Sequence, residues 1–550
     1  MGKRKRTEVS NETAAPGPSN TKKAKAAAPR SQENGEPTSP SSSLTQPVNI
    51  QIVTGSYDRI LHGITATITP DEKVEFADTF LFNAHTSAIR CLALSPPSAP
   101  EPGRAQKVML ASGSSDERIN VYNISAHPPS SSSSSSSKKG GAGGLNDVLS
   151  SVAPRRILEN PRNRELGTLL HHSASVTRLA FPARSKLLSA AEDSTVAVAR
   201  TRDWAVLSSI RTPAPRPLGR PSGDTAALGA APRGVNDFAV HPSMKLMITV
   251  GRGERCMRLW NLMTARKAGV LNFGRDVLRQ VGEGGRGALG EGRRVVWGRG
   301  DGDGGDDEFC VAFDRDLLVF GMDSRPKCRV MPDHRSKVHE VCYVATGGEG
   351  DASLLAVSTE DGRIMFFSTK SEDLTAAPAE TSKTSHPSKD GKTDDNSDSN
   401  SNSDKKAESS SSQSQSLPGA KFGAYLGGKE AGVTGRIKDF AGLRAAAEEG
   451  GGGERLIIPT GSSDGKVRVF SLAVDELIEA AARKGKDEDK EARRVGRLLG
   501  TYDTSNRITC LEAFVMIPRP EGVEDSEDED GDDGFEDVSS EDDDDDEDDE

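Results

Sequence analysis

Three short stretches of the sequence carry residues that could do chemistry. GAYLGGKE, from Gly423, comes close to a phosphate-binding loop, but Glu430 stands where Ser or Thr must hold Mg²⁺. His339-Glu340 opens the sequence HEVCY, which lacks the second histidine of a zinc-protease site. Arg299-Gly300-Asp301 matches an adhesion tripeptide, although no secretory signal accompanies it. No Ser, His and Asp share a nucleophile-elbow context. The sequence therefore predicts a protein that is not an enzyme and has no cofactor.

The six cysteines are also unsuited to metal or redox chemistry. They occur singly, with no CxxC pair, at Cys91, Cys256, Cys310, Cys328, Cys342 and Cys510. Several lie inside apolar runs, as in IRCLAL. We therefore expect reduced thiols in the core of an intracellular protein, and no metal site. No apolar run is long enough to span a bilayer, so no membrane association is expected.

Aspartates recur at one fixed place in a repeated pattern, which favours a structural role over catalysis. The clearest unit is Val235 to Leu262, three short strands joined by turns and ending in Trp260-Asn261. Related units occupy residues 110–124, 187–201, 355–369 and 458–472, and a partial one starts at Ile52 with Asp58 in its turn. An apolar hairpin ending in an aromatic residue is typical of a WD40 blade, a small antiparallel sheet.

The predicted structural positions are the turn aspartates, the aromatics that fill the space between blades, and two histidines beside turns. They are His85, Asp116, Tyr122, Asp193, His241, Trp260, Asp361, Phe367, Asp464 and Phe470. Two units depart from the pattern. Gly253-Glu254 stands where a turn aspartate is expected, and Ala199 takes the place of an aromatic.

These units predict an all-β fold, a single WD40 propeller of about seven blades. The first unit lacks an opening strand, whereas RITCLEAFVM, from Arg507, is a strand without a blade. Pairing the two would close the ring and remove its free edges.

Composition limits the folded part of the chain. Only 34% of the 550 residues are hydrophobic and 4% are aromatic, low values for a compact domain. We expect a disordered basic tail over 1–46, a propeller over 47–518 and a disordered acidic tail over 519–550. Disordered insertions are expected near 128–150, 213–232, 275–292 and 370–420.

Charge is unevenly distributed along the chain. The last thirty residues hold 21 of the 83 acidic residues and no basic one, so 62 acidic residues face 71 basic ones in the rest. Two basic clusters near the start resemble a nuclear localisation signal: Lys3, Arg4, Lys5, Arg6, Lys22, Lys23 and Lys25. In the acidic tail, Ser526, Ser539 and Ser540 each precede an acidic residue by three positions, as acidophilic kinase sites do. The tail could be a solubilising segment, a competitor of RNA, or a holder of basic proteins.

The sequence resembles one group of WD40 proteins more narrowly. VNDFAVHPSMKL with RLWNLMTARKA, together with GSSDERINVYNI and IQIVTGSYDRILHGI, is similar to the p21-activated-kinase-interacting-protein-like family, which includes the yeast maintenance-of-killer WD-repeat protein. The likeness extends to about Ala268 and weakens beyond it. It implies a nucleolar scaffold for assembly of the large (60S) ribosomal subunit and rRNA maturation. Its partners would be pre-60S particle proteins and rRNA, with the chain monomeric in a larger complex.

Two other classes stay open. The resemblance also implies a possible adaptor that negatively regulates p21-activated kinase, which would be cytoplasmic. A chromatin or ubiquitin-ligase substrate receptor is the second alternative, since the WD40 pattern alone establishes only a scaffold.

Overall fold

The computed structural model describes most of the chain between residues 47 and 519. The described ranges are 47–102, 104–129, 157–158, 160, 162–213, 233–283, 290–299, 307–346, 353–375, 416–445, 454–482 and 493–519. Within these ranges no helix has both the length and the apolar character needed to cross a membrane.

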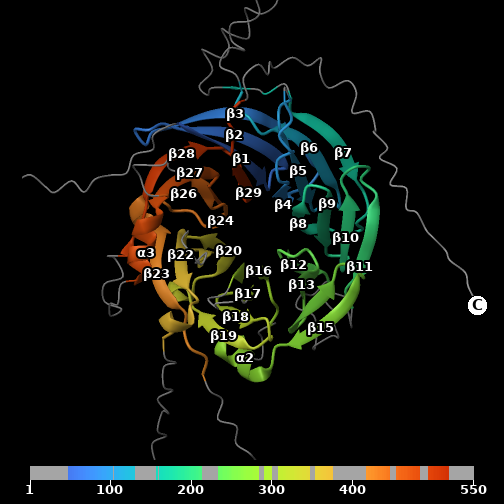
Figure 1. Ribbon diagram of the computed structural model, residues 1–550, viewed down its shortest axis with the longest axis vertical. Coiled ribbons are helices and arrows are strands. Elements are labelled where there is room, and N and C mark those ends of the chain that lie inside the picture. Colours follow the sequence, from blue (N-terminus) through green and yellow to red (C-terminus); the bar gives the residue numbers. More distant parts are fainter. Residues whose placement is uncertain are drawn as a thin grey trace, which may run out of the picture. The chain divides into compact units, whose positions relative to one another are not determined.

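Seven antiparallel sheets stand in a ring around a central hollow (Figure 1). Blade 1 contains β29 (Ile508–Val515), β1 (Val48–Ser56), β2 (Ile60–Ile68) and β3 (Val74–Asn83), from the hollow outward. Blade 2 contains β4 (Ile89–Leu94), β5 (Lys107–Ser114), β6 (Ile119–Ser125) and β7 (Arg164–Leu169). Blade 3 contains β8 (Val176–Ala183), β9 (Lys186–Ala191), β10 (Thr195–Arg200) and β11 (Val206–Arg211).

The other four blades follow in chain order. Blade 4 contains β12 (Val235–Val240), β13 (Leu246–Gly251), β14 (Cys256–Asn261) and β15 (Arg266–Asn272). Blade 5 contains β16 (Arg294–Arg299), β17 (Asp307–Ala312), β18 (Leu317–Gly321) and β19 (Pro326–Val330). Blade 6 contains β20 (Val338–Ala345), β21 (Ser353–Thr359), β22 (Arg363–Ser368) and β23 (Lys421–Gly427). Blade 7 contains β24 (Ile437–Phe440), β26 (Arg455–Ser462), β27 (Lys466–Ala473) and β28 (Arg497–Asp503), with β25 (Leu443–Ala445) also on β26.

The last described strand closes the ring, as the sequence predicted. β29 pairs antiparallel with β1, with Ile50 opposite Val515 and Thr54 opposite Leu511. The first blade is therefore made from both ends of the described chain, and β29 covers the inner edge of β1. The expected seven-bladed all-β propeller is confirmed.

The burial of each strand explains its composition. The second strand of a blade, such as β5, is covered on both faces, so its apolar residues are nearly continuous. The outermost strand, such as β7, is largely exposed and polar. The core consists of apolar clusters between neighbouring blades. One of them joins Ile52 and Ile64 of blade 1 to Ile457 and Val469 of blade 7.

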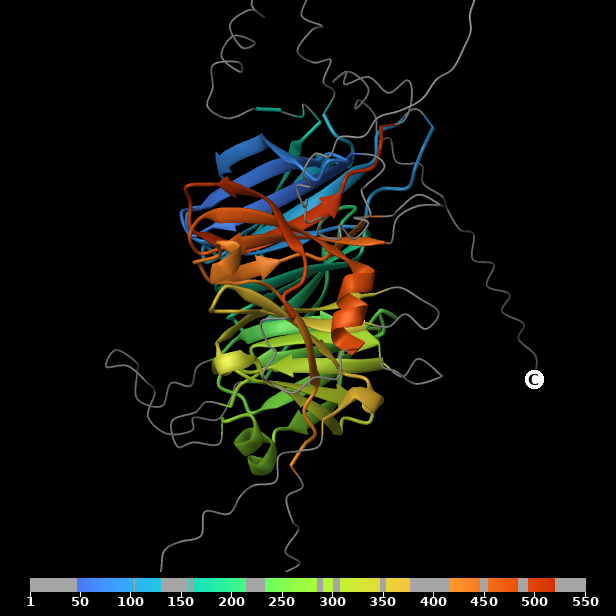
Figure 2. The same ribbon diagram turned by 90° about the vertical axis from the view of Figure 1, so that its left-hand side faces the viewer.

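Helices are few and lie outside the sheets. α3 (Val474–Ala482) lies between β27 and β28 of blade 7 in the chain and packs beside β23 on the rim of the ring (Figures 1 and 2). It buries Leu477 and Ala480 in the cluster between blades 6 and 7. Three 3-10 turns, η2 (Asp333–Arg335), η3 (Ser371–Asp373) and η4 (Lys429–Ala431), complete the described helical segments.

Two predicted insertions are more ordered than expected. The segment near 275–292 begins with α2 (Arg275–Gln280), and Leu278 and Val281 are buried beside Phe313. The charged residues around Leu278 and Val281 made this segment look like a disordered insertion. The prediction of disorder was therefore wrong for the residues of α2. The ends of the 370–420 insertion meet, because Thr375 and Gly419 exchange backbone hydrogen bonds of 2.9 and 3.0 Å. These two ends therefore belong to the ordered propeller.

Several predictions fall outside the described residues. They are the basic clusters within 1–46, the three serines of the acidic tail, and the interiors 130–156, 214–232 and 376–415 of the predicted insertions.

Candidate functional site

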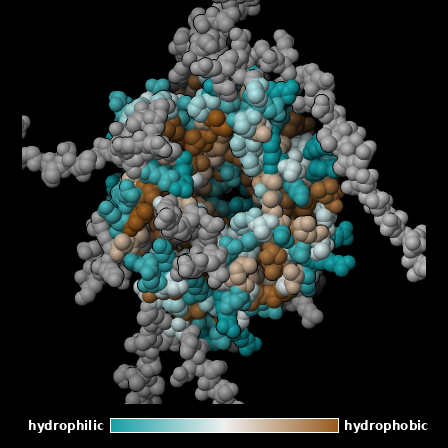
Figure 3. Space-filling view, in the orientation of Figure 1, coloured by the Kyte–Doolittle hydropathy of each residue, from teal (hydrophilic) through white to brown (hydrophobic). Residues whose placement is uncertain are grey.

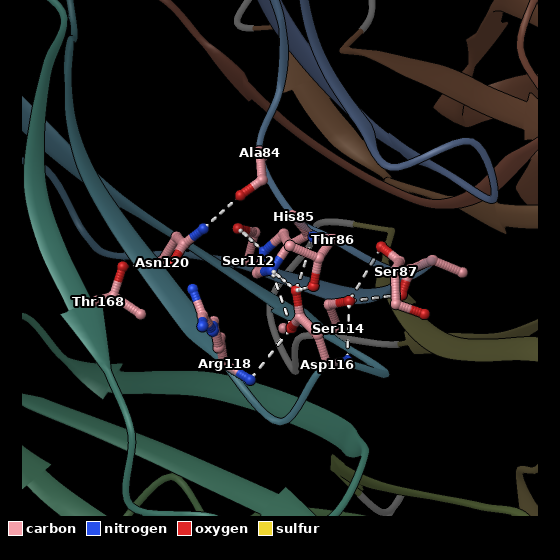
Figure 4. Close-up of polar contacts among 12 residues, drawn as sticks. Ala84, His85, Thr86, Ser87, Ser112, Ser114, Asp116, Arg118, Asn120 and Thr168 are labelled. Carbon is pink, nitrogen blue, oxygen red and sulfur yellow. Dashed lines mark hydrogen bonds and ion pairs between the residues drawn. The ribbon is translucent and has the colours of Figure 1, made fainter.

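The turn aspartate of blade 2 organises the first part of the candidate site (Figure 4). Both carboxylate oxygens of Asp116 lie 3.2 Å from Nδ1 of His85, and His85 Nε2 lies 2.8 Å from the hydroxyl of Ser112. The amide of Thr86 donates to Asp116 at 2.9 Å and the amide of Arg118 at 3.2 Å. One side chain thus fixes the loop that enters the blade and the turn between its two central strands.

The charges in this network follow from burial and hydrogen bonding. Burial lowers the pKa of His85, which therefore stays neutral near pH 7. Burial opposes ionisation of Asp116, but the Thr86 amide and His85 together outweigh it, so the pKa of this carboxyl is lowered. The arrangement is a neutral histidine bonded to a carboxylate, which fits a structural role in holding the turn.

Blade 3 repeats the network with a histidine that the sequence reading missed. His172 Nδ1 lies 3.1 Å from Asp193, and its Nε2 lies 2.8 Å from the hydroxyl of Ser189. The signal was present, since HHSASVTRLAF places a histidine before its strand as AHTSAIRCLAL does. The adjacent His171 obscured the correspondence.

The remaining turn positions use other partners. Asp361 accepts from the hydroxyl of Thr359. Asp464 accepts from Arg468 Nη2 at 2.8 Å. In blade 4, Glu254 replaces the aspartate and accepts from Arg258 Nη2 at 2.7 Å. The apparent departure at Glu254 therefore preserves the ion pair, four residues apart, that blade 7 makes.

Predicted aromatics occupy one equivalent place in their blades. In each of these blades the pairing of the third strand with the fourth shifts at a bulge directly before the aromatic residue. The four residues are Tyr122, Trp260, Phe367 and Phe470. All four are buried between blades, and the indole N–H of Trp260 donates to Thr249 at 2.8 Å. The same bulge precedes Phe320 in blade 5, which the sequence reading did not identify, and Ala199 in blade 3.

His241 lies at a different position from His85. It follows inner strand β12, and its Nε2 is 2.6 Å from Asp307 of blade 5. Its ring meets the edge of Trp297 at 4.7 Å between centroids. His241 therefore fastens blade 4 to blade 5 and is not part of a repeated turn.

Inner strands present one polar residue each to the central hollow. In six blades the pairing of the inner strand shifts near its start, and in blades 1, 2, 3, 4 and 7 a single residue stands unpaired between its neighbours. Such bulges redirect side chains. The residues at this level form a ring at one mouth of the hollow: Arg90, Thr177, Asn236, Arg294, His339, Lys438 and Thr509.

A layer of charged groups lies one residue further along the inner strands. Arg178 lies 3.4 Å from both Asp237 and Glu340, and Arg294 lies 3.1 Å from Glu340. Asp237 also accepts the amide of Val295 at 2.9 Å. Asp439 accepts the amide of Leu511 at 2.8 Å in the same way. These carboxylates therefore join consecutive blades.

Burial, assisted by the neighbouring Glu340, raises the pKa values of several carboxyl groups in this layer. Burial, then Glu340 and Glu512, raise the pKa of Asp439. Burial raises the pKa of Glu512 to about 7, with Arg178 opposing and Glu340 assisting. Glu512 therefore stays partly protonated near neutral pH.

The other residues that the sequence offered as possible functional sites lie in the strands and core of the propeller. The P-loop-like stretch is outer strand β23 followed by a three-residue 3-10 turn, so no helix N-terminus is available for phosphates. His339 and Glu340 lie on inner strand β20. The cysteines are free thiols, five buried and Cys342 partly so, and burial raises the pKa of Cys91 to about 12. Across the described ranges, no three His, Cys, Asp or Glu residues are grouped to hold a metal ion.

Comparison with known proteins agrees with this geometry. The model of the WD domain, G-beta repeat, matches residues 77–123 and 163–198. The chain is 26% identical over 226 residues to a p21-activated protein kinase-interacting protein 1-like protein of Danio rerio, 41% of this chain and 43% of that protein. It is 27% identical over 245 residues to Protein MAK11 of Saccharomyces cerevisiae, 40% and 43% of the two chains. Shk1 kinase-binding protein 15 of Schizosaccharomyces pombe is 22% identical over 222 residues, 40% and 46%.

The fold is a seven-bladed β-propeller, and two stretches of it match the WD40 repeat. Its narrower similarity is to the p21-activated-kinase-interacting-protein-like group and MAK11, as the sequence predicted. The alignments span less than half the length of these relatives.

Proposed function

We propose that this WD40 propeller is a non-enzymatic scaffold in nucleolar assembly of the large ribosomal subunit and in rRNA maturation. The similarity to MAK11, together with the family resemblance of the first four blades, carries this proposal. The excess of basic residues outside the acidic tail supports it, because assembling particles are rich in RNA phosphate.

Affinity purification with and without ribonuclease, followed by sedimentation in a sucrose gradient, tests the proposal. The tagged full-length protein should sediment with precursors of the large subunit and should release rRNA precursors after ribonuclease treatment. Sedimentation only as free protein, with no rRNA precursor recovered, would contradict it.

Adaptor function toward a p21-activated kinase is a second candidate. It is favoured by the names of two relatives, a p21-activated protein kinase-interacting protein 1-like protein and Shk1 kinase-binding protein 15. This function predicts recovery of a kinase from a cytoplasmic fraction, in an amount that ribonuclease does not change.

Nuclear import through the two basic clusters is part of the proposal. Replacing Lys3, Arg4, Lys5, Arg6, Lys22, Lys23 and Lys25 with Ala should leave a reporter fusion in the cytoplasm. An unchanged nucleolar signal would assign import to another sequence or to a partner.

A further inference from the structure

The mouth of the hollow that carries the ring of polar residues is strongly basic. A cavity of about 420 Å³ opens there, lined by seven Lys or Arg residues and a single carboxylate, Glu291. A hollow at the centre of the ring is visible in Figure 3. Outside the acidic tail basic residues outnumber acidic ones only 71 to 62, so a ratio of seven to one at the mouth reflects placement more than composition.

Three of the seven ring residues hold neighbouring blades together. Thr177 donates to the carbonyl of Val235 at 2.7 Å, and Thr509 donates to that of Ile89 at 2.7 Å. Asn236 donates to the carbonyl of Gly292 at 2.9 Å. These side chains have a sufficient structural explanation in the links between neighbouring inner strands.

The sector formed by blades 6, 7 and 1 is different. Among the described residues, no carboxylate lies within ion-pair distance of the side chain of Lys438 or Arg507. Arg507 instead rests over the ring of Tyr57, 5.8 Å from its centroid. His339 lies between them and blade 5, and its Nε2 is buried with no hydrogen-bond partner among the described residues.

The electrostatic field of this sector favours an anion. Burial, and then Lys438, Lys337, Arg436 and Arg294, lower the pKa of His339 to about 4. Burial and the neighbouring Arg436 and Arg507 also lower the pKa of Lys438. The Lys and Arg side chains of this sector therefore repel one another across a small opening, and an anion placed between them would relieve that repulsion.

We propose that this mouth is a binding site for an acidic peptide segment of a partner protein, with aspartate, glutamate or phosphoserine side chains held by Lys438, Arg507 and His339. Side chains of one peptide can converge on an opening of this size, and Arg and Lys bind carboxylate and phosphate alike. The carboxylate layer of Asp237, Glu340 and Asp439 stops the anion at the mouth.

Single-stranded RNA fits the same observations less well. RNA binding in a groove uses a track of cations with aromatic rings on which successive bases stack. Here the cations converge on one opening. Apart from His339, the aromatic residues of the lining are Tyr57 and Phe313. Phe313 is buried, and Arg507 covers the ring of the exposed Tyr57.

Fluorescence anisotropy of purified full-length protein with a labelled peptide of ten glutamates tests the site. The double variant Lys438→Gln, Arg507→Gln removes two cations that make no ion pair with any described residue, so the fold should persist, which an unchanged melting temperature verifies. We expect peptide affinity to fall more than tenfold. The matched control Arg325→Gln removes an exposed cation in the β18–β19 turn and should leave affinity unchanged.

Three outcomes would overturn the inference. Equal peptide affinity in the double variant and the Arg325 control would show that the mouth is not the site. Loss of binding to a labelled ten-uridine RNA, with peptide binding retained, would assign the mouth to nucleic acid. A tenfold gain in peptide affinity on deleting residues 520–550 would assign it to the chain's own tail. The inference does not depend on a role in ribosome assembly, because every component of the assay is purified.

Discussion

Asp116 holds two segments of blade 2 together, so its loss should destabilise the protein. Asp116→Ala leaves His85 and the Thr86 amide without their acceptor, which should cost about 1–3 kcal/mol of unfolding free energy. Asp203→Ala, which removes an exposed carboxylate beside Arg200, is the control and should leave the melting curve unchanged. Equal melting temperatures for the two variants would mean that the turn network does not stabilise the blade.

Trp260 fills the space between blades 3 and 4. Trp260→Ala should lower the unfolding free energy by about 3–5 kcal/mol, as emptying a large core site does. Trp260→Phe keeps a ring there and loses the bond to Thr249, so it should cost less in the same chemical denaturation experiment. A stable Trp260→Ala variant that fails to bind its partner would instead identify a surface contact.

Glu512 makes stability depend on pH. Its pKa is about 7 in the fold against an ordinary 4.5, so the folded state holds an extra proton between these values. Stability should therefore fall as pH rises from about 4.5 through 7. Glu512→Gln should remove part of this slope. The gain in unfolding free energy caused by the substitution should be larger at pH 8 than at pH 5 by about 1–3 kcal/mol, a range reduced for partial solvent access.

Melting temperatures of the Glu512→Gln variant and of Glu117→Gln, an exposed turn control, measured from pH 5 to 8, check this expectation. Parallel curves for both variants and the unaltered protein would show that Glu512 is ionised in the fold throughout.

β29 is the element on which closure depends. Deleting Arg507 to Met516 exposes the inner edge of β1 and removes the packing of Leu511 and Ile508 against blade 7. We expect unfolding or aggregation, seen by circular dichroism and size-exclusion chromatography. Deleting 520–550 instead is the matched control and should leave a monodisperse protein. A β29 deletion that melts like the unaltered protein would rule out this closure.

Strands and turns could be predicted where the sequence repeats. Features that depend on how neighbouring strands are aligned with one another were harder to predict. The hairpins ending at Trp260 and Phe470 and the closing strand could be read from apolar runs and turn residues. Bulges that turn Lys438 and Asn236 into the mouth could not, because they arise from pairing between strands. Glu254 hid its turn role because a longer side chain makes the same ion pair as Asp464.

At the scale of the whole molecule, blades are joined by apolar clusters at their flanks and by polar links around the hollow. Asp237 and Asp439 tie consecutive inner strands, and the basic mouth lies just beyond them. Sequence alone suggested a basic body but not its concentration at one opening, because the cations come from separate blades.

Depletion of the protein from cells, with ribosomal subunits then separated on a sucrose gradient and rRNA precursors measured, tests the central claim most directly. The account predicts that free large subunits fall relative to small ones and that unprocessed precursors of large-subunit rRNA accumulate. Normal subunit ratios and normal precursor levels after complete depletion would contradict the account.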